Sequence, residues 1–317
     1  MTTATKPFSP SPKVLSQNPS RLEPGHRLCP GCTLGTIARN VLSVTEDPVI
    51  AVSSTGCFEI CTGAFPYTAW QIPWIHSLFE NAASVAAGLD ALKQAWRRKG
   101  LLDSEQEKIK IVVFAGDGAS YDIGFQWISG AFERGHDLVY VCTDNEGYMN
   151  TGYQRSSATP WGGHTSTTPI GSHSDGKAQN RKNLTQIFAA HDIPYVAQAS
   201  PSHMADLVRK AHKAFEIKGP AFLNILSSCP TNWKFPTKQA IEILKVAVET
   251  NFWPLYEVEK GKYKLNFQNR NKKDIKEFLS MQRRFKHLLK DEKKVQQIQE
   301  EVDREFDRLK KLSEIFA

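Results

Sequence analysis

Two short stretches decide the fold of this chain. Residues 109–118 read IKIVVFAGDG, and residues 138–145 read LVYVCTDN. Each contains an apolar run, Ile111–Ala115 or Leu138–Cys142, that is followed by a polar turn, which is typical of a strand buried on both faces with a turn at its carboxyl end. A helix is predicted between them, from about Ile123 to Arg134. Because strand, helix and strand form the unit of a parallel sheet, the pair indicates an α/β fold.

The same alternation continues on both sides of these stretches. The other predicted strands are Val49–Ser53, Tyr195–Ala199 and Ala221–Leu226, and the other predicted helices are Leu34–Leu42, Ser77–Arg98, Leu184–Ala190 and Pro201–Ile217. We therefore expect a mostly parallel sheet with helices on both faces. Ligands of such sheets collect beyond the carboxyl ends of the strands. The long polar stretch Asp144–Lys182 is expected to be a functional loop there.

The chain is predicted to have three parts. Residues 1–21 form an N-terminal arm, residues 22–258 form the α/β domain, and residues 259–317 form a charged, mainly helical extension. From Leu255 onward there are 17 Lys and Arg against 12 Asp and Glu, so most of the net charge of +7 lies in this region. We interpret the surplus first as a solvated helical face. The second interpretation is a docking surface for an acidic partner such as a ferredoxin.

Composition narrows the class of protein. The chain has 317 residues, of which 40% are hydrophobic, and this suits a globular protein with a substantial core. It has no run of about 18 apolar residues, so no membrane span is expected. Its first 20 residues lack the apolar segment of an export signal, so a cytoplasmic location with reduced thiols is expected. No recognition motif accompanies the basic charge, so nucleic acid is not expected as a partner.

The turns behind the two deciding strands carry oxygen ligands. Asp117 lies between Gly116 and Gly118 after the first strand, and Asn145 follows the second. A carboxylate, an amide oxygen and the backbone carbonyl of Gly147 would suit Mg²⁺. The glycines would let the backbone approach a diphosphate beside a helix start. The alternative is a simple strand-to-helix turn capped by the aspartate, and the spacing of the pair makes it the weaker interpretation.

Four of the six cysteines have the pattern of a metal site. They are Cys29, Cys32, Cys57 and Cys229. The first two form Cys-Pro-Gly-Cys in a turn-rich loop, so thiolates from three segments could enclose a [4Fe–4S] cluster. Spacing alone also allows a zinc site with four cysteines. Structural thiols are the third interpretation, which we prefer for Cys142 inside an apolar strand. Cys61 is ambiguous, because it could exchange roles with Cys57 if that segment is helical.

Longer motifs around these positions resemble a known family. They are GDGASYDIG at 116–124, DNEGYMNTG at 144–152, QRSSATP at 154–160 and HSLFENAA at 76–83. Together they resemble the β subunits of 2-oxoacid:ferredoxin oxidoreductases, and most closely those that act on pyruvate. The resemblance runs from about Cys29 to Tyr256. Many members of the family have alanine at the position of Gly147, a change that a backbone carbonyl ligand tolerates.

The resemblance implies a thiamine-diphosphate-binding fold that holds thiamine diphosphate, Mg²⁺ and one [4Fe–4S] cluster. The implied magnesium ligands are Asp117, Asn145 and the Gly147 carbonyl, and the implied cluster ligands are Cys29, Cys32, Cys57 and Cys229. Asn150 would be the catalytic residue near the thiazolium and the substrate. Thr55 and His76 are further candidates for substrate contact, although a structural role for His76 is an equal alternative. The other implied cofactor contacts are Gly56, Gly116, Gly118, Ala119 and Thr151.

The implied activity is the CoA-dependent oxidative decarboxylation of pyruvate to acetyl-CoA and CO₂, or the reverse, with electrons passed through the cluster to ferredoxin. Thiamine diphosphate also needs a carboxylate against its pyrimidine ring. Glu59 and Glu80 could be proposed for this role, but each is better interpreted as structural. We therefore expect a heteromer with an α subunit that supplies the activating glutamate. Ferredoxin-like γ and δ subunits or domains, and an external ferredoxin, would carry the electrons onward.

Three alternatives stay open. The first is the same chemistry on oxalate or a branched-chain 2-oxoacid, because much of the pocket would come from the partner subunit. The second is a non-redox thiamine diphosphate enzyme half with a structural zinc. The third is a zinc-stabilised scaffold in which the Gly-Asp-Gly turn is incidental. A brown colour that is lost on oxidation by air would separate the iron–sulfur enzyme from the other two classes.

Overall fold

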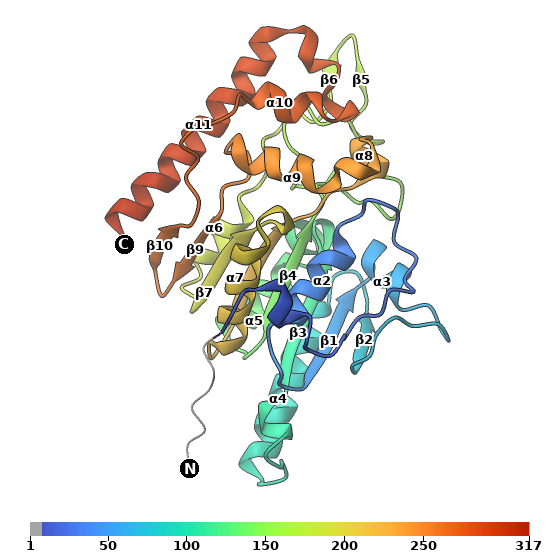
Figure 1. Ribbon diagram of the computed structural model, residues 1–317, viewed down its shortest axis with the longest axis vertical. Coiled ribbons are helices and arrows are strands. Elements are labelled where there is room, and N and C mark those ends of the chain that lie inside the picture. Colours follow the sequence, from blue (N-terminus) through green and yellow to red (C-terminus); the bar gives the residue numbers. More distant parts are fainter. Residues whose placement is uncertain (1–7, 317) are drawn as a thin grey trace.

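A single large sheet is the framework of the molecule. The computed structural model describes residues 8–316, so residues 1–7 of the predicted N-terminal arm, and residue 317, lie outside the described residues. Eight strands lie in the order β10-β9-β7-β8-β4-β3-β1-β2 (Figure 1). The six strands from β7 to β2 pair in parallel, while β9 and β10 run antiparallel to their neighbours. The predicted mostly parallel sheet is thus confirmed.

Five of the eight strands, β1, β3, β4, β7 and β8, match the predicted apolar runs closely. The bounds of the eight strands are β1 Val49–Ser54, β2 Trp74–Ser77, β3 Lys110–Gly116, β4 Val139–Asp144, β7 Tyr195–Ala199, β8 Ala221–Leu226, β9 Tyr256–Glu259 and β10 Lys262–Leu265. In β3, Val112 and Phe114 belong to one core while Val113 and Ala115 belong to the other. Both faces are buried, which explains why this strand is apolar from Ile111 to Ala115 rather than alternating.

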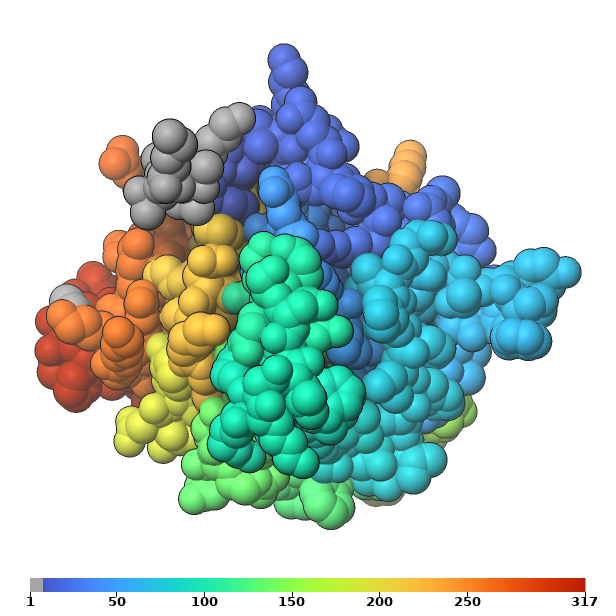
Figure 2. Space-filling model, turned by 90° about the horizontal axis from the view of Figure 1, so that it is seen from below, coloured from blue at the N-terminus to red at the C-terminus, as the bar shows by residue number. Residues whose placement is uncertain are grey.

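Helices cover both faces of the sheet. They are α1 Pro12–Leu15, α2 Leu34–Leu42, α3 Cys57–Thr62, α4 Ala82–Arg98, α5 Phe125–Glu133, α6 Leu184–Ala189, α7 Met204–Glu216, α8 Pro230–Trp233, α9 Ala240–Glu249, α10 Ile275–Ser280 and α11 Glu292–Ile315. Helices α2 and α7 contribute to the core on one face, and α4, α5 and α6 contribute to the core on the other. Seen from below, α4 faces the viewer near the centre, and the segment between α3 and β2 projects at the right in light blue (Figure 2).

A third core lies at the C-terminal end of the chain. Its buried side chains include Trp233, Leu244, Phe278 and Phe285. Helix α11 continues along this layer and packs on β10 (Figure 1). The extension therefore covers this chain's own body. The division into three parts stays a proposal, and the hairpin of β9 and β10 lies across its boundary at residue 258.

Several local predictions were wrong. The helix predicted from Ser77 begins at Ala82, because Trp74–Ser77 forms the edge strand β2. The helix predicted from Ile123 begins at Phe125, after a π-helical turn over Gly118–Ile123. The hairpin of β9 and β10 was not predicted, since the lysines of Lys262–Leu265 give that strand no continuous apolar run. The loop Asp144–Lys182 carries only a two-residue hairpin, β5 Ile170–Gly171 with β6 Ser174–Asp175.

Candidate functional site

A cavity of about 200 Å³ opens at the carboxyl ends of β1, β3 and β4. Its wall combines the ends of these strands with the start of α3 and the loop after β4. Nine of the predicted cofactor residues line it: Thr55, Gly56, Gly116, Asp117, Gly118, Asn145, Gly147, Asn150 and Thr151. Cys57 lines it as well, whereas His76 and Ala119 do not. The fold therefore brings together residues that are almost 100 positions apart in the sequence.

A larger cavity, of about 550 Å³, lies between α11 and the sheet. Its wall includes Trp253, Arg304 and Leu309, and none of the predicted cofactor residues borders it. Ligands of open parallel sheets bind beyond the carboxyl ends of the strands. We therefore take the smaller cavity as the candidate site.

Three oxygen-bearing groups converge beside the smaller cavity. One end of the Asn145 amide lies 2.9 Å from Asp117 Oδ1 and 3.0 Å from the Gly147 carbonyl oxygen. If the Asn145 side-chain oxygen occupies this end, it faces only hydrogen-bond acceptors. If the amide is rotated by 180°, its nitrogen donates to both Asp117 Oδ1 and the Gly147 carbonyl. Carboxylate, amide and carbonyl oxygens that face one another without a donor suit a hard divalent cation. The donor set therefore fits Mg²⁺.

Asp117 is the charged member of this group, and it is buried. Ser156 Oγ donates to Asp117 Oδ2 at 2.5 Å, and the backbone N–H of Asn145 donates to Oδ1 at 3.4 Å. Burial, and then the neighbouring Asp144 carboxylate, raise the pKa of Asp117 well above its ordinary value. A bound cation would stabilise the ionised carboxylate and offset both effects. Ser156 was not predicted, because nothing in its motif distinguishes it from the serine that follows.

The glycines around the cavity have different roles. A Cβ built on Gly56 or Gly116 would meet no atom within 4 Å, so both backbones border open space into which a diphosphate could fit. A Cβ on Gly118 would instead lie 2.0 Å from the Tyr148 ring. Gly118 is thus needed because a side chain there would clash with Tyr148, and not because it leaves room for a ligand. Tyr148 also donates to Asp122 at 2.6 Å, which ties the loop after β4 to the π-helical turn.

The loop after Asn145 forms the outer rim of the cavity. Asn150 and Thr151 are exposed there, and Thr151 Oγ1 donates to Gln154 Oε1 at 2.5 Å. A Cβ on Gly147 would lie 2.9 Å from the Gln154 carbonyl oxygen, so alanine at this position would need a small shift of the loop. The rim leaves the Asn150 amide accessible to a ligand in the cavity.

Thr55 is linked to a histidine outside the cavity. Its Oγ1 lies 3.0 Å from His76 Nε2 and donates to the Ser77 carbonyl at 3.1 Å. The hydroxyl hydrogen is therefore directed to the carbonyl, which leaves His76 Nε2 as the donor to Thr55. On its other side, His76 Nδ1 lies 3.4 Å from the buried Glu59 carboxylate. His76 and Glu59 thus hold the threonine side chain at the wall of the cavity.

Cys57 lines the cavity, and the cysteines that influence its charge are Cys229, Cys61 and Cys29. Burial, followed by the thiols of Cys229, Cys57 and Cys29, raises the pKa of Cys32 to about 12. Burial, followed by Cys229 and Cys61, raises the pKa of Cys57 to about 12. The thiols thus lie within electrostatic range of one another, and a metal that bound them would have to displace their protons. Cys142 is buried inside β4, as predicted.

The cysteine group is not a closed cage in this structure. Within residues 8–316, no three His, Cys, Asp or Glu side chains are arranged so that they could hold a metal ion. Cys29 is exposed, Cys32 and Cys57 are half-buried, and Cys229 is buried. Cys61 also lies near Cys29, because the Cys29 thiol contributes to the raised pKa of Cys61. The choice of Cys29, Cys32, Cys57 and Cys229 as ligands stays a proposal.

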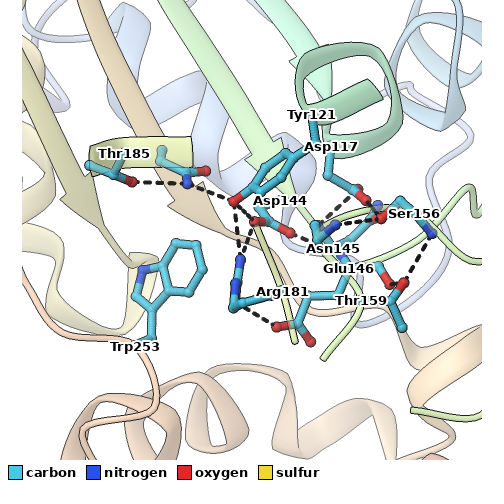
Figure 3. Close-up of polar contacts among 12 residues, drawn as sticks. Asp117, Tyr121, Asp144, Asn145, Glu146, Ser156, Thr159, Arg181, Thr185 and Trp253 are labelled. Atoms are coloured by element: carbon cyan, nitrogen blue, oxygen red, sulfur yellow. Dashed lines mark hydrogen bonds and ion pairs between the residues drawn. The ribbon is translucent and has the colours of Figure 1, made fainter. Parts of the chain in front are cut away.

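A buried network of ion pairs involves Asp144 and Glu146, the two residues that flank Asn145 in the chain (Figure 3). Arg181 donates to Asp144 Oδ2 at 2.6 Å and to Glu146 Oε1 at 3.0 Å. Tyr121 donates to the same Asp144 oxygen at 2.6 Å. A second arginine, Arg284, pairs with Glu146 from the C-terminal extension. None of these pairs was predicted, since their members are separated by between 23 and 138 positions and no local pattern connects them.

The fold and the cavity define a thiamine-diphosphate-binding class of protein. Residues 54–225 match the family described as "Thiamine pyrophosphate enzyme, C-terminal TPP binding domain". A solved structure, the 2-oxoglutarate:ferredoxin oxidoreductase from Magnetococcus marinus, shares the fold with a TM-score of 0.54 at 24% sequence identity, over 72% of each chain. The predicted fold class is confirmed.

Relatives with higher sequence identity define the family within this class. The chain is 45% identical to the pyruvate synthase subunit PorB of Methanocaldococcus jannaschii, over 88% of this chain and 93% of that one. It is 42% identical to the ketoisovalerate oxidoreductase subunit VorB of Pyrococcus furiosus, over 92% and 93% of the two chains. The chain belongs to this family of 2-oxoacid:ferredoxin oxidoreductase β subunits, and it is an oxidoreductase subunit. Among residues 8–316, no helix combines the length and the apolar character that a membrane span requires.

Proposed function

We propose that the chain is the β subunit of a pyruvate:ferredoxin oxidoreductase, which converts pyruvate and CoA to acetyl-CoA and CO₂ or runs in reverse. The observation that carries this proposal is the meeting of Asp117, Asn145 and Gly147 beside a cavity that Cys57 also lines. An oxygen site for a metal diphosphate and a thiol group for an electron acceptor thereby share one cavity. The relatives called pyruvate synthase support pyruvate as the substrate.

The three oxygen groups would hold Mg²⁺, and the open backbone at Gly56 and Gly116 would accept the diphosphate. When bound, thiamine diphosphate supplies a nucleophilic carbon for the carbonyl of a 2-oxoacid. Asn150 would orient the substrate from the rim of the cavity. Thr55, held by His76, would present its hydroxyl oxygen to the same space. Thr151 and the buried Ala119 are the remaining proposed contacts.

Cys29, Cys32, Cys57 and Cys229 would hold one [4Fe–4S] cluster, which supplies a one-electron acceptor next to the thiamine site. Sulfur ligands from three segments of the chain suit such a cluster. Because thiolates must stay unoxidised to bind iron, we place the complex in the reducing cytoplasm. Electrons would leave through ferredoxin-like γ and δ subunits or domains to an external ferredoxin.

An α subunit would complete the site. Of the residues described, Asp117 is the one carboxylate that lines the cavity, and it belongs to the proposed magnesium site. Glu59 is engaged by His76, which supports its structural interpretation. The glutamate that activates the pyrimidine ring would therefore come from the partner subunit.

Purification of the intact complex from its native host would test the proposal. We expect about four irons per β chain, from the count of a single cluster. We also expect thiamine diphosphate binding that requires Mg²⁺, and CoA-dependent reduction of ferredoxin by pyruvate. Zinc in place of iron would remove the redox assignment. The VorB relative makes a branched-chain 2-oxoacid the second candidate substrate, and faster turnover of 2-oxoisovalerate than of pyruvate would favour it.

A further inference from the structure

Glu146 stands between two proposed magnesium ligands in a strained conformation. Its φ is 68°, in the left-handed region that non-glycine residues rarely adopt. Such a conformation persists only where its surroundings hold it in place. The side chain is fully buried, so its charge also needs partners within the protein. Whatever holds Glu146 therefore also fixes the positions of Asn145 and Gly147.

Two arginines from distant parts of the chain hold this carboxylate. Arg181, at the end of the long loop, donates to Oε1 at 3.0 Å and also pairs with Asp144. Arg284, in the C-terminal extension, donates to Oε2. Two carboxylates and two guanidinium groups thus balance in charge. Without Arg284, one buried negative charge would be left in excess beside the cation site.

Arg284 is itself a buried residue. Its side chain is 1% exposed, and its Nε donates to Gln282 Oε1 at 2.6 Å. The guanidinium carbon lies 4.2 Å from the centre of the Trp233 ring, which is a stacking contact. Trp233 Nε1 in turn donates to the Asn145 carbonyl at 3.1 Å. Arg284 therefore contacts the loop that carries Asn145 and Gly147 in two ways. It pairs with Glu146, and it stacks on Trp233, which donates to the Asn145 carbonyl.

The surrounding extension contacts the same loop at other points. The backbone N–H of His164 donates to the Arg284 carbonyl at 3.2 Å, and His287 Nε2 lies 2.8 Å from the Asp175 carbonyl. Arg284 also lies within electrostatic range of Cys229, where its charge lowers the pKa of the thiol against the effect of burial. One side chain of the extension is thus close to both proposed cofactor sites.

We propose that Arg284 is a positioning residue for the magnesium-binding loop. By neutralising and holding Glu146, it keeps Asn145 and Gly147 in the arrangement that binds the metal diphosphate. The C-terminal extension would thereby be part of the cofactor site. This inference rests on the proposed thiamine diphosphate function.

The test uses the intact complex and measures the affinity for thiamine diphosphate by calorimetry over a series of Mg²⁺ concentrations. For Arg284→Met we expect affinity to fall at least tenfold, and the Mg²⁺ concentration needed for half-maximal binding to rise. Arg283→Met is the matched control, because Arg283 is the exposed neighbour in the same turn. We expect this control to bind like the wild type. Thermal unfolding and iron content would report whether each complex is assembled.

A double variant, Glu146→Gly with Arg284→Met, tests the route through Glu146. It restores the charge balance, and glycine adopts the left-handed conformation without strain. We expect its affinity to return to within about threefold of the wild type, which is under 1 kcal/mol. If the Arg284→Met complex does not assemble, the double variant, in which the buried charges balance, tests the inference in its place.

Three outcomes would overturn the inference: unchanged affinity in an assembled Arg284→Met complex, an equal loss in Arg283→Met, or no recovery in the double variant. Failure of the proposed function is a separate result. In that case the wild-type complex itself would bind no thiamine diphosphate at any Mg²⁺ concentration.

Discussion

The oxygen site and the cysteine group meet at one cavity but are built differently. Asp117 and Asn145 are buried and follow directly on strands of the sheet. The cysteines lie in loops or at the starts of short helices, and one of them, Cys29, is exposed. The Asn145 amide lies within 3.0 Å of both the Asp117 carboxylate and the Gly147 carbonyl, whereas no three His, Cys, Asp or Glu side chains among residues 8–316 are arranged to hold a metal ion. We infer that the sheet preforms the oxygen site, and that the sulfur site closes when its metal binds.

The largest effect should come from breaking the oxygen site alone. We expect Asp117→Asn to weaken Mg²⁺-dependent binding of thiamine diphosphate by about a thousandfold, or roughly 4 kcal/mol, because the metal loses its charged ligand. Iron content should stay at the wild-type value, as measured on the intact complex. Asp122→Asn is the control in the same turn and should change affinity far less. Loss of iron in Asp117→Asn would contradict the independence of the two sites.

Removing a proposed sulfur ligand should have the reverse effect: the iron content should fall while thiamine diphosphate still binds. We expect Cys32→Ser to lose most of the iron and the reduction of ferredoxin, because one of the four proposed cluster ligands is removed. Thiamine diphosphate should still bind, to within about threefold of the wild-type affinity, which is under 1 kcal/mol. Cys61→Ser is the matched control and should keep its iron, as iron analysis and electron paramagnetic resonance would report. If Cys61→Ser loses the iron and Cys57→Ser keeps it, the assignment of Cys57 as a ligand is wrong.

A smaller effect should follow from the hydroxyl that supports Asp117. We expect Ser156→Ala to weaken Mg²⁺-dependent binding about tenfold, because a hydrogen bond to a charged group is worth about 1.5–3 kcal/mol. The proposed Mg²⁺ would bind the ionised carboxylate, and the pKa of Asp117 is raised, so we expect the affinity to fall as pH falls. Ser156 lowers that pKa. Its removal should therefore move the loss of affinity to higher pH, which titrations across pH would detect. Ser157→Ala should leave the profile unchanged.

The smallest effect on either site should come from the far end of α11. Leu309 is buried against the body of the protein and lies far along the chain from both sites. We expect Leu309→Ala to reduce the free energy of unfolding by about 2–3 kcal/mol, from lost burial and the cavity left behind. Cofactor affinity and iron content should not change. A loss of thiamine diphosphate binding would mean that the whole of α11, and not only the turn around Arg284, supports the site.

Much of the fold and part of the site follow from local sequence patterns. Strands β3, β4, β7 and β8 were predicted because each is a mostly apolar stretch of five to seven residues. The turns behind β3 and β4 revealed Asp117 and Asn145, since the ends of parallel strands meet at one edge. Edge strand β2 was missed because only four residues form it, and they precede a helix without a break in pattern.

The supporting contacts could not be predicted in the same way. Arg181 and Arg284 occur among many other basic residues, and only the folded chain brings them to Glu146. The strained φ of Glu146 could not be predicted from the sequence, because it is glycine or asparagine, and not glutamate, that usually indicates a left-handed conformation. The sequence thus predicts the groups that would touch a cofactor better than it predicts the groups that hold them.

The position of Arg284 in the chain also matters while the protein is being made. A ribosome releases the chain from its N-terminus, so β3, β4 and the loop after them emerge long before residue 284. Until residue 284 has been synthesised, the Glu146 carboxylate has Arg181 as its one ion-pair partner among the residues described. A residue synthesised 138 positions after Glu146 therefore completes the contacts of this loop, and a nascent chain would be able to close the loop only after residue 284 has emerged.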